Sequence, residues 1–460
     1  MKKLLLINPV GQRTGYLLSK LSTLPPLNLA YIAAVTPSTW DVEIVDENFN
    51  KFEFEEADLV GITAFTSNIN RAYEIARIYR ERKIKVIMGG IHASMIPEEA
   101  LQYADAVVVG EGERIWERVI QDFENNTLLP KYIGPQVDLT QFKITPRRDL
   151  LDPKYYWQSV QTSRGCPFNC NFCSVSKYLG KEFRQRKTRD ILDELEEIKD
   201  EHIVFVDDNL IGYSQESKKR AIELFEGMIN RGIRKKWWMQ ASINVADDEL
   251  VIKLAAESGC IFVFIGFETI NKTILNKMKK GINLKTGVEN YKKVVDTLHK
   301  YGIGVLGAFI IGNDYESPQY YKELADFLVN SGISSVQITV LTPLPGTNLM
   351  EQIQKEERLI YKDFPHDWDK YRFSYMVHQP QGVDIDTIYI GNNYIKDRIY
   401  SFPTYQFRLL KSLYKLKNIS NFYTIYKFNQ ALKRNWINSH YYGKYPRKFK
   451  SQLSFNNLEI

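Results

Sequence analysis

Cysteine is scarce in this chain. Only four occur in 460 residues, at positions 166, 170, 173 and 260, and none precedes Cys166. A secreted protein of this size would normally spread its cysteines as distant disulfide pairs. Three cysteines within eight residues instead favour a reducing cytoplasm and a metal site.

Long apolar runs are absent as well. No run approaches the ~20 residues that a membrane-spanning helix requires, and the apolar start ends at Pro9, too early for a secretory signal. We therefore expect a cytoplasmic protein. Hydrophobic residues form 44% of the chain and charged residues 25%, which excludes a disordered chain and a collagen-like fibre. At ~100–200 residues per domain, the length predicts two or three domains.

Acidic residues are almost missing from the end of the chain. From Ser401 onward there are 11 Lys/Arg against one Asp/Glu, together with 14 aromatic residues. Such a segment can contact nucleic acid, anionic lipid or an acidic partner, but it is more often a packed helical extension with a solvated lysine face. We expect no nucleic acid, and peripheral membrane contact as the alternative to a purely structural role. The pattern predicts an amphipathic helix over 401–435, with Tyr405, Leu409, Leu410, Leu413 and Leu416 facing inward and Lys411, Lys415 and Lys417 facing outward.

Residues 1–127 alternate apolar strands with helical patterns. The strands are expected at 4–7, 42–46, 59–63, 85–88 and 106–109. This alternation predicts a doubly wound, flavodoxin- or Rossmann-like parallel sheet, whose ligands bind beyond the carboxyl ends of the strands. The loops at those ends, 8–9, 63–68, 89–94 and 110–113, are rich in Gly and small polar residues, so that a large flat ligand can approach the backbone.

Residues 128–156 contain prolines and no clear periodicity, and we interpret them as a linker. A second alternating series over 157–350 has strands at 159–163, 203–207, 237–241, 261–268, 305–312 and 336–341. Six β/α units predict a partial TIM-type barrel, followed by a mainly helical C-terminal extension over 351–460. Functional residues of such a barrel lie at the strand ends, where this chain has Asp207, Asp208, Asn209, Gln240, Ser242, Glu268, Gln337 and Thr339.

The most specific motif is the spacing C-x3-C-x2-C, formed by Cys166, Cys170 and Cys173 in a loop rich in Gly, Pro and Asn. Three thiolates on one loop can hold three corners of an iron–sulfur cube and leave the fourth for a non-protein ligand. A structural zinc normally takes four protein ligands, and no fourth Cys or His lies nearby in the sequence. Cys260 stands alone at the start of a strand and is interpreted as a small buried apolar residue.

This motif resembles that of the radical S-adenosylmethionine (SAM) superfamily, and so does Phe172 directly before the third cysteine. Residues 207–209 resemble the segment that contacts the SAM methionine moiety, and 266–268 the segment that reaches the ribose. Three segments, 25–31, 88–94 and 109–113, together resemble the cobalamin-binding domain that precedes the barrel in one subclass. The Asp-x-His-x-x-Gly motif of cobalamin mutases is absent, so His92 is expected near the corrin but not on its cobalt.

The resemblance implies three cofactors: a [4Fe–4S] cluster on the three cysteines, SAM, and cobalamin. It places SAM against Phe172, Asp207, Asp208, Asn209, Gln240, Ser242, Glu268 and Gln337. It places cobalamin against Thr63, Ser67, Gly89, Gly90, His92, Gly110, Glu111 and Gly112. A flavodoxin- or ferredoxin-type protein is the implied electron donor.

The implied reaction is cleavage of SAM to a 5′-deoxyadenosyl radical, followed by cobalamin-dependent methylation of an unactivated carbon. The alternative within the same family is ring contraction, cyclisation, oxidation or carbon–carbon coupling, with or without bound cobalamin. A non-catalytic iron–sulfur scaffold is a third hypothesis, but it would not need the SAM-contacting segments. No residue is singled out as catalytic, and no motif identifies the substrate, for which a lipid-like or other natural-product intermediate is our expectation.

Overall fold

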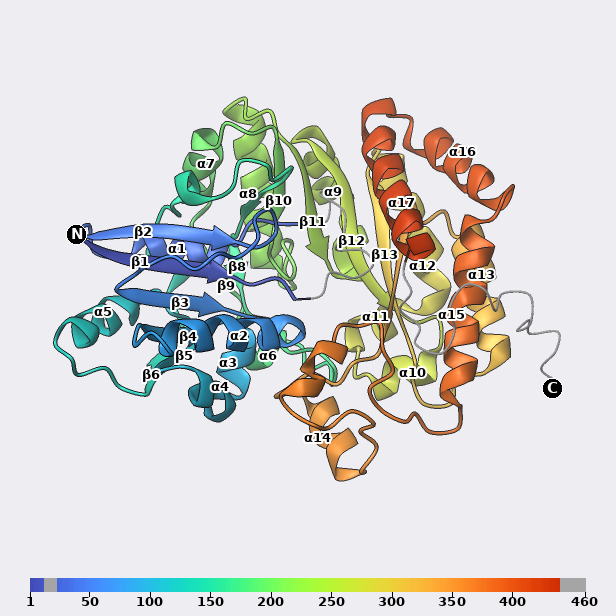
Figure 1. Cartoon of the computed structure of the whole chain (residues 1–460). Helices are drawn as coiled ribbons and strands as arrows, with labels where there is room; N and C mark the ends of the chain where they lie inside the picture. The colour runs from blue at the N-terminus through green and yellow to red at the C-terminus, as the bar shows by residue number, and fades with distance from the viewer. Residues whose placement is uncertain (12–22, 439–460) are drawn as a thin grey trace.

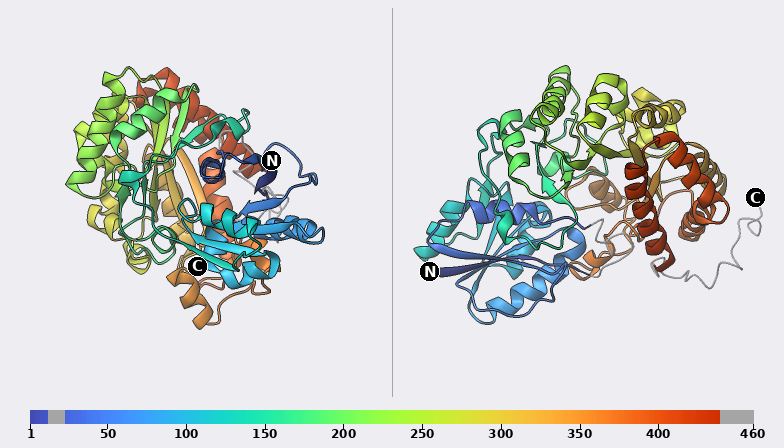
Figure 2. Two further views of the ribbon diagram at one scale, coloured as in Figure 1. Left: turned by 90° about the vertical axis from the view of Figure 1, so that its left-hand side faces the viewer. Right: turned by 90° about the horizontal axis from the view of Figure 1, so that it is seen from above.

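The computed structural model describes residues 1–11 and 23–438. Two six-stranded parallel sheets follow one another along the chain, and a largely helical part completes it (Figure 1). Seen from above, the N-terminal domain and the C-terminal helices lie on opposite sides of the molecule, with the second sheet between them (Figure 2). The predicted mixed α/β fold is confirmed.

The N-terminal sheet has the strand order β2-β1-β3-β4-β5-β6. Its central strands are apolar on both faces because helices cover both sides of the sheet. The strand order reverses between β1 and β3, and this reversal is where a crevice opens at the carboxyl ends of the strands. The strands are β1 (Lys2–Asn8), β2 (Trp40–Asp46), β3 (Leu59–Thr63), β4 (Lys85–Gly89), β5 (Ala106–Gly110) and β6 (Lys131–Gly134). The helices are α1 (Leu27–Ala34), the 3-10 turn η2 (Thr66–Asn68), α2 (Ile69–Arg80), α3 (Ile91–Met95), α4 (Pro97–Tyr103) and α5 (Trp116–Glu124).

Strand β6 lies inside the segment that the sequence indicated as a linker. It pairs in parallel with β5, with Tyr132 opposite Val108. Of its four residues only Tyr132 is buried, so this edge strand has no apolar period that could have revealed it. Two 3-10 turns, η3 (Leu139–Gln141) and η4 (Arg148–Leu150), then lead to the second sheet.

The second sheet has the order β14-β13-β12-β11-β10-β7 and forms the predicted partial barrel. Helices cover its outer face and share one large apolar core with it. Its inner face carries a smaller apolar cluster that includes Trp157, Trp238 and Phe262. The strands are β7 (Gln158–Val160), β10 (His202–Phe205), β11 (Lys236–Ala241), β12 (Cys260–Glu268), β13 (Gly304–Ile311) and β14 (Ser335–Val340), with a short antiparallel pair, β8 (Ser163–Arg164) and β9 (Arg184–Gln185).

Helices and 3-10 turns between these strands complete the β/α alternation of this domain. They are α6 (Val175–Tyr178), α7 (Thr188–Glu197), α8 (Gln215–Asn230), η5 (Ile243–Asp247), α9 (Glu249–Glu257), α10 (Lys272–Lys277), α11 (Gly281–Thr286), η6 (Val288–Asn290), α12 (Tyr291–Lys300) and α13 (Pro318–Asn330).

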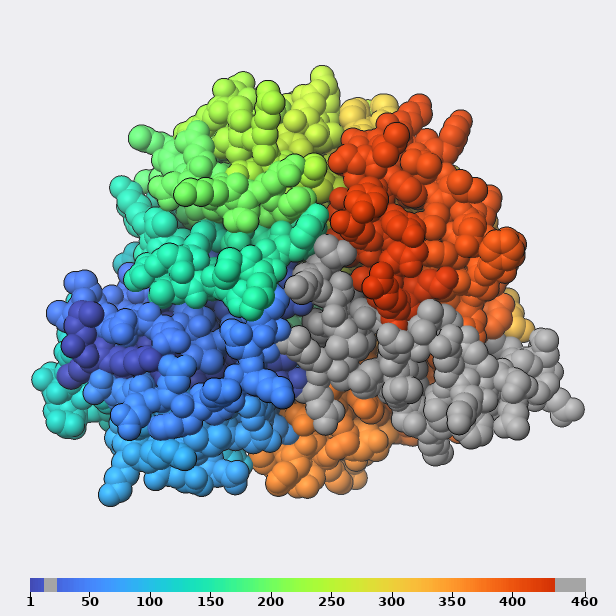
Figure 3. Space-filling model, turned by 45° about the horizontal axis from the view of Figure 1, so that its top comes forward, coloured from blue at the N-terminus to red at the C-terminus, as the bar shows by residue number. Residues whose placement is uncertain are grey.

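The C-terminal part holds the two sheets together. Its first section, α14 (Asn348–Lys355) and η7 (His366–Lys370), lies against the N-terminal domain, where Trp368 and Val377 share an apolar core with Ile75 of α2. This section is the orange surface beside the blue domain in Figure 3. Three helices follow, α15 (Ile385–Tyr400), α16 (Thr404–Leu416) and α17 (Ile419–Asn438). Phe428 of α17 packs on the inner face of the barrel sheet.

The predicted single helix over 401–435 is instead two helices. Lys417 adopts a left-handed backbone conformation with φ 49° and ends α16. Tyr405 and Leu416 are buried as predicted, but Leu410 is 66% exposed. Two of the three lysines expected to face solvent contact the barrel: Lys411 donates to the Asn330 carbonyl, and Lys415 pairs with Asp296. Residues 439–460 of the predicted extension lie outside the described residues.

Candidate functional site

A cavity of about 1170 Å³ lies where the carboxyl ends of the two sheets face each other. This exceeds the ~300–1,000 Å³ of an ordinary small-molecule pocket. Its lining comes from the N-terminal loops (8–11, 61–68, 87, 89–91 and 110–113), the barrel (Arg164, Ser174, Tyr178, Val206, Asp208, Gln240 and 336–339) and the C-terminal helices (Lys396, Ile399, Tyr400 and Leu432). The cavity is therefore built jointly by all three parts of the chain.

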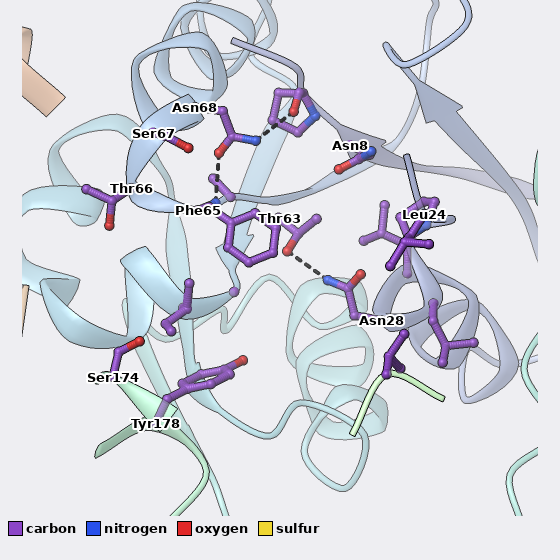
Figure 4. A pocket seen from close by; sticks show the side chains of 18 of the residues that line it. Asn8, Leu24, Asn28, Thr63, Phe65, Thr66, Ser67, Asn68, Ser174 and Tyr178 are labelled. Atoms are coloured by element: carbon purple, nitrogen blue, oxygen red, sulfur yellow. Dashed lines mark hydrogen bonds between the residues drawn. The ribbon is translucent and has the colours of Figure 1, made fainter. Parts of the chain in front are cut away.

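The N-terminal loops form a wall of backbone and small side chains (Figure 4). Asn28 of α1 donates to Thr63 Oγ1 at 2.8 Å, and Asn68 donates to the Pro9 carbonyl at 2.8 Å. Gly90 has φ 89°, and a Cβ there would lie 2.7 Å from Thr63 Oγ1 and 3.0 Å from the Ala64 backbone. Only glycine fits this conformation and spacing, so the wall can accept a large flat molecule such as a corrin.

Most residues predicted from the sequence for the two large cofactors do line this cavity. They are Thr63, Ser67, Gly89, Gly90, Gly110, Glu111, Gly112, Asp208, Gln240 and Gln337. The structure places Phe172, Asp207, Asn209, Ser242, Glu268 and His92 outside that lining. Of the second group, Phe172 and Glu268 lie around the cysteine loop, whereas His92 faces elsewhere.

His92 is directed into the N-terminal domain and does not reach the cavity. Its ring is fully buried, with Nδ1 3.1 Å from Thr66 Oγ1 and Nε2 3.2 Å from Glu99 Oε1. Glu99 also accepts from Trp368 Nε1 at 3.0 Å. His92 therefore does not line the cavity. Its ring binds Thr66 and Glu99 within the N-terminal domain, and Glu99 in turn joins this domain to Trp368 of the C-terminal section.

Glu111 lines the cavity, but its carboxylate is bound to arginines. It accepts from Arg164 Nη1 at 2.8 Å, from Arg184, and from the Val137 amide at 2.9 Å. Arg164 also pairs with Glu113 at 2.5 Å. All four charged side chains are at most 8% exposed. We call them the interdomain clamp, because they tie the loop after β5 to the segment that precedes Cys166.

The three cysteines lie on the loop between β8 and α6, and all three are partly exposed. Asn171 holds this loop to the barrel: its amide donates to the Met278 carbonyl at 3.1 Å and its side chain to the Lys277 carbonyl at 3.0 Å. Tyr213, which the sequence analysis missed, places its hydroxyl 3.4 Å from Cys166 Sγ. In the described part of the chain no three His, Cys, Asp or Glu side chains converge on one metal ion, but a four-iron cluster takes its ligands from more widely spaced sulfurs.

A buried ion pair lies beside the cysteines. Lys280 Nζ donates to Glu268 Oε1 at 2.7 Å. Burial raises the pKa of the Cys173 thiol to about 12, and the Lys280 ammonium acts in the opposite direction. Burial also raises the pKa of the Cys170 thiol, and iron would displace the thiol protons on binding. A cationic side chain beside Cys170 and Cys173 suits a cluster of thiolate ligands, so the donor set fits an iron–sulfur cluster.

The three residues Asp207, Asp208 and Asn209 face different directions. The Asp207 carboxylate accepts from the Thr162 amide at 3.0 Å and from Ser163 Oγ at 2.5 Å, and is fully buried. Asp208 is exposed and lines the cavity, where partial loss of solvation and the neighbouring charge of Asp207 raise its pKa to about 7. Asn209 donates to the Gly212 carbonyl at 3.2 Å. Only Asp208 is therefore placed to contact a ligand in the cavity, while Asp207 positions the strand that leads into the cysteine loop.

We expect Asp207→Asn to destabilise the protein by about 2–4 kcal/mol. The amide would put N–H groups against the Thr162 and Ser163 donors in a site that water does not reach. Denaturant-induced unfolding of the metal-free protein measures the change. Asp208→Asn is the matched control, since it alters the adjacent carboxylate but none of these hydrogen bonds; equal losses in the two variants would contradict the assignment.

Lys396 of α15 also lines the cavity and was not singled out from the sequence. Burial lowers the pKa of its ammonium to about 7, and the carboxylate of Asp397 acts in the opposite direction. It lies within a regular helical segment without a motif. Only its placement against the cavity separates it from the many lysines at the surface.

Two family models match the chain. The radical SAM superfamily matches residues 160–371, and the B12 binding domain matches residues 14–120. The two matched ranges meet at the cavity, where the N-terminal loops face the barrel.

Curated relatives cover most of the chain. Bacteriochlorophyllide d C-12(1)-methyltransferase of Chlorobaculum tepidum is 31% identical over 395 residues, which is 83% of each chain. Bacteriochlorophyllide d C-8(2)-methyltransferase of the same organism is 28% identical over 88% of this chain and 91% of the relative. Hopanoid C-2 methylase of Rhodopseudomonas palustris is 29% identical over 74% of this chain and 66% of the relative.

Solved structures share the fold. The radical SAM methyltransferase TsrM from Kitasatospora setae, with cobalamin and a [4Fe–4S] cluster bound, superposes with a TM-score of 0.62 over 77% of this chain and 75% of its own, at 18% identity. The cobalamin-dependent radical SAM enzyme OxsB, with SAM and aqua-cobalamin bound, gives 0.68 over 94% of this chain and 71% of its own, at 16% identity. Together with the cysteine loop and the shared cavity, these matches show that the chain belongs to the B12-binding radical SAM family, enzymes that use a [4Fe–4S] cluster, SAM and cobalamin.

Proposed function

We propose that this enzyme transfers a methyl group to an unactivated carbon of a large, mainly apolar substrate that carries an anionic group. The supporting observation is the single cavity shared by the N-terminal loops, Asp208 at the end of a barrel strand, and Lys396 of the C-terminal helices. When bound, the cluster and SAM supply hydrogen-abstracting radical chemistry and cobalamin supplies the methyl group.

The residues of the chain then have separate tasks. Cys166, Cys170 and Cys173 would hold the cluster, and Asp208 would receive the cationic end of SAM on the barrel side. The loops with Gly90 and Gly112 would carry cobalamin on the opposite wall. A flavodoxin- or ferredoxin-type protein would supply electrons, since every radical SAM enzyme needs an electron donor.

The substrate class is supported by the lining and by the relatives. The cavity walls are mostly apolar, and two relatives are named for methylating bacteriochlorophyllide d and a hopanoid, which are large apolar ring systems. Lys396 provides a poorly solvated cation within this surface. We assign to this side chain the recognition of an anionic group on an otherwise apolar substrate.

The direct test uses protein that has been reconstituted anaerobically with iron, sulfide and cobalamin. A visible corrin spectrum and about one cobalt per chain are expected. With methyl-deuterated SAM and a lipid extract as substrate source, mass spectrometry should find a product that carries the labelled methyl group. Protein that takes up no corrin, yet forms 5′-deoxyadenosine and an unmethylated product, would establish the other radical reactions instead. Methyl transfer is favoured over them because the relatives that cover most of the chain are named as methyltransferases.

We expect Lys396→Met to stabilise the substrate-free protein at about pH 6. The pKa of Lys396 in the folded protein is lowered to about 7. Below that pH the charged ammonium lowers the free energy of unfolding. This destabilisation disappears as the pH rises toward about 10.4, the pKa of lysine in the unfolded chain, so the stability of the parent rises between these two pH values. The variant should thus exceed the parent by a few kcal/mol at about pH 6 and by much less at about pH 9. Thermal unfolding at both pH values measures this, and a pH-independent difference would contradict it.

A further inference from the structure

The outer surface of α16 and the start of α17 is apolar. Phe407, Leu410 and Tyr414 on α16 are 52%, 66% and 80% exposed, and Ile419 and Tyr423 on α17 are 79% and 56% exposed. Phe402, just before α16, is 80% exposed. We call these six residues the aromatic face. Helix α16 lies at the edge of the molecule (Figure 1), so this face is not a seam between domains.

The aromatic face follows from the helical period. Phe407, Leu410 and Tyr414 are spaced i, i+3 and i+7, which places them on one side of α16. The opposite side packs against the barrel through Tyr405 and Arg408, and Arg408 donates to the Ile399 and Ile333 carbonyls. The helix is thus held to the protein partly by polar contacts and presents large apolar side chains to the surroundings. Large apolar side chains thus lie on both sides of α16, Tyr405 and Leu416 inside and these three outside, and an exposed apolar patch of this kind marks a contact surface.

Charge identifies what the surface contacts. Residues 404–438 contain seven Lys/Arg and no Asp/Glu. Of these, Arg408, Lys411 and Lys415 also contact the barrel, whereas Lys417 is exposed. Two of the lysines lie over rings of the aromatic face: Lys411 is 5.7 Å from the Phe407 ring centre and Lys427 is 4.5 Å from that of Tyr423. Interleaved aromatic and basic side chains suit the boundary between lipid headgroups and acyl chains. A nucleic acid would leave Leu410 and Ile419 in water, whereas an anionic bilayer accepts both the charge and the apolar side chains.

We propose that the aromatic face seats this enzyme on the surface of an anionic membrane. Phe402, Phe407, Leu410, Tyr414 and Ile419 enter the headgroup region, and Lys417 and Lys427 face the lipid phosphates. The contact is peripheral: among the described residues no helix is long and apolar enough to cross a bilayer. The proposal goes beyond the methyl transfer proposed above and needs none of the cofactors.

Flotation with unilamellar vesicles tests it. The full-length protein is mixed with vesicles of phosphatidylcholine alone or of phosphatidylcholine with phosphatidylglycerol. We expect binding to the anionic vesicles at low salt, and at least about tenfold weaker binding of the variant Phe407→Ser/Leu410→Ser/Tyr414→Ser. Lys417→Gln/Lys427→Gln should also bind more weakly and lose the salt dependence in part, because exposed charges are screened beyond ~8 Å at physiological ionic strength.

The matched control is Ile133→Ser/Leu250→Ser/Ile360→Ser, which removes three exposed apolar side chains from other surfaces. It should float like the parent. All variants should keep the parent's far-ultraviolet circular dichroism and, after reconstitution, its rate of SAM cleavage in detergent. The proposal is overturned if the parent does not bind anionic vesicles at low salt, or if the aromatic-face variant binds as the parent does. It is also overturned if that variant only converts a dimer to a monomer, which would make the face an interface between copies.

Discussion

Alanine at Cys166, Cys170 or Cys173 is expected to abolish the formation of 5′-deoxyadenosine from SAM. Each of these cysteines supplies one of three protein ligands to the cluster, and losing a ligand leaves a second iron without a protein partner. The loss should be complete within detection, because no other described side chain stands ready to replace a thiolate. Iron content, the visible absorbance of the cluster and anaerobic SAM turnover measure the effect.

Cys260→Ala is the matched control for these variants. Cys260 lies in β12 and is 2% exposed, and its thiol donates a hydrogen bond to the Phe262 carbonyl at 3.7 Å. This variant should keep a full complement of iron and near-parental SAM cleavage. Turnover by the triple cysteine variant, or loss of the cluster in Cys260→Ala alone, would show that the ligands have been wrongly assigned.

The second large effect is expected at the interdomain clamp. Burial opposes ionisation of Glu111, but the hydrogen bond from Arg184 and the charge of Arg164 outweigh it and lower the pKa of this carboxyl. Glu111→Ala would leave two buried guanidinium groups without this partner, at a cost of about 3–5 kcal/mol. Because the clamp joins the cobalamin-domain loop to the segment before Cys166, the cofactors would also lose their fixed separation, and methyl transfer should fall more than SAM cleavage.

The measurements are the unfolding midpoint and the ratio of methylated product to 5′-deoxyadenosine. Glu111→Gln keeps the shape of the side chain but removes its charge, so its unfolding midpoint and product ratio should lie between those of the parent and Glu111→Ala. Glu98→Gln removes an exposed ion pair with Lys131 in the same domain and should change stability by less than about 1 kcal/mol. If Glu111→Ala has the same stability and the same product ratio as the parent, the interdomain clamp neither stabilises the fold nor fixes the separation of the cofactors. Since the pKa of Glu111 is lowered in the folded protein, its contribution is present at neutral pH and is lost as acid protonates it.

Features that depend on neighbours along the chain could be derived from the sequence. The spacing of Cys166, Cys170 and Cys173 puts three thiols on one loop whatever surrounds it. Apolar runs such as 4–7 and 203–205 predict buried parallel strands, because a strand covered on both faces must be apolar throughout. The carboxyl ends of parallel strands lie on one edge of a sheet, so the loops that carry Gly90 and Gly112 could be assigned to one ligand region of the first sheet, and Asp208 to a ligand region of the second.

The tertiary structure alone decided which of these side chains are available to ligands. Asp207 and Asp208 are adjacent, yet the Asp207 carboxylate accepts hydrogen bonds from Thr162 and Ser163, whereas Asp208 faces the cavity. Glu111 was expected to touch cobalamin, but Arg164, 53 residues away, and Arg184, 73 residues away, bind its carboxylate. His92 is occupied by Thr66 and Glu99 in the same way. Such partners are brought together by the packing of domains, for which neighbouring residues carry no signal.

The tail shows the same division. A helical period could be read from the sequence, but it indicated one helix over 401–435 with its lysines facing solvent, where the structure has two helices and two of the three lysines contact the barrel. The sequence could not predict which side of the helix faces the barrel. The positions of Leu410 and Lys411 in the amphipathic pattern are compatible with either orientation. The barrel offers the Asn330 carbonyl to Lys411 and the Asp296 carboxylate to Lys415, so these two lysines turn inward, while Lys417 and the aromatic face stay exposed. The sequence by itself determined the loop that carries three cysteines and the succession of two α/β domains along the chain. The contacts of the folded chain decided which residues enclose the cavity and which surface is exposed, because only those contacts settle which polar groups are already paired.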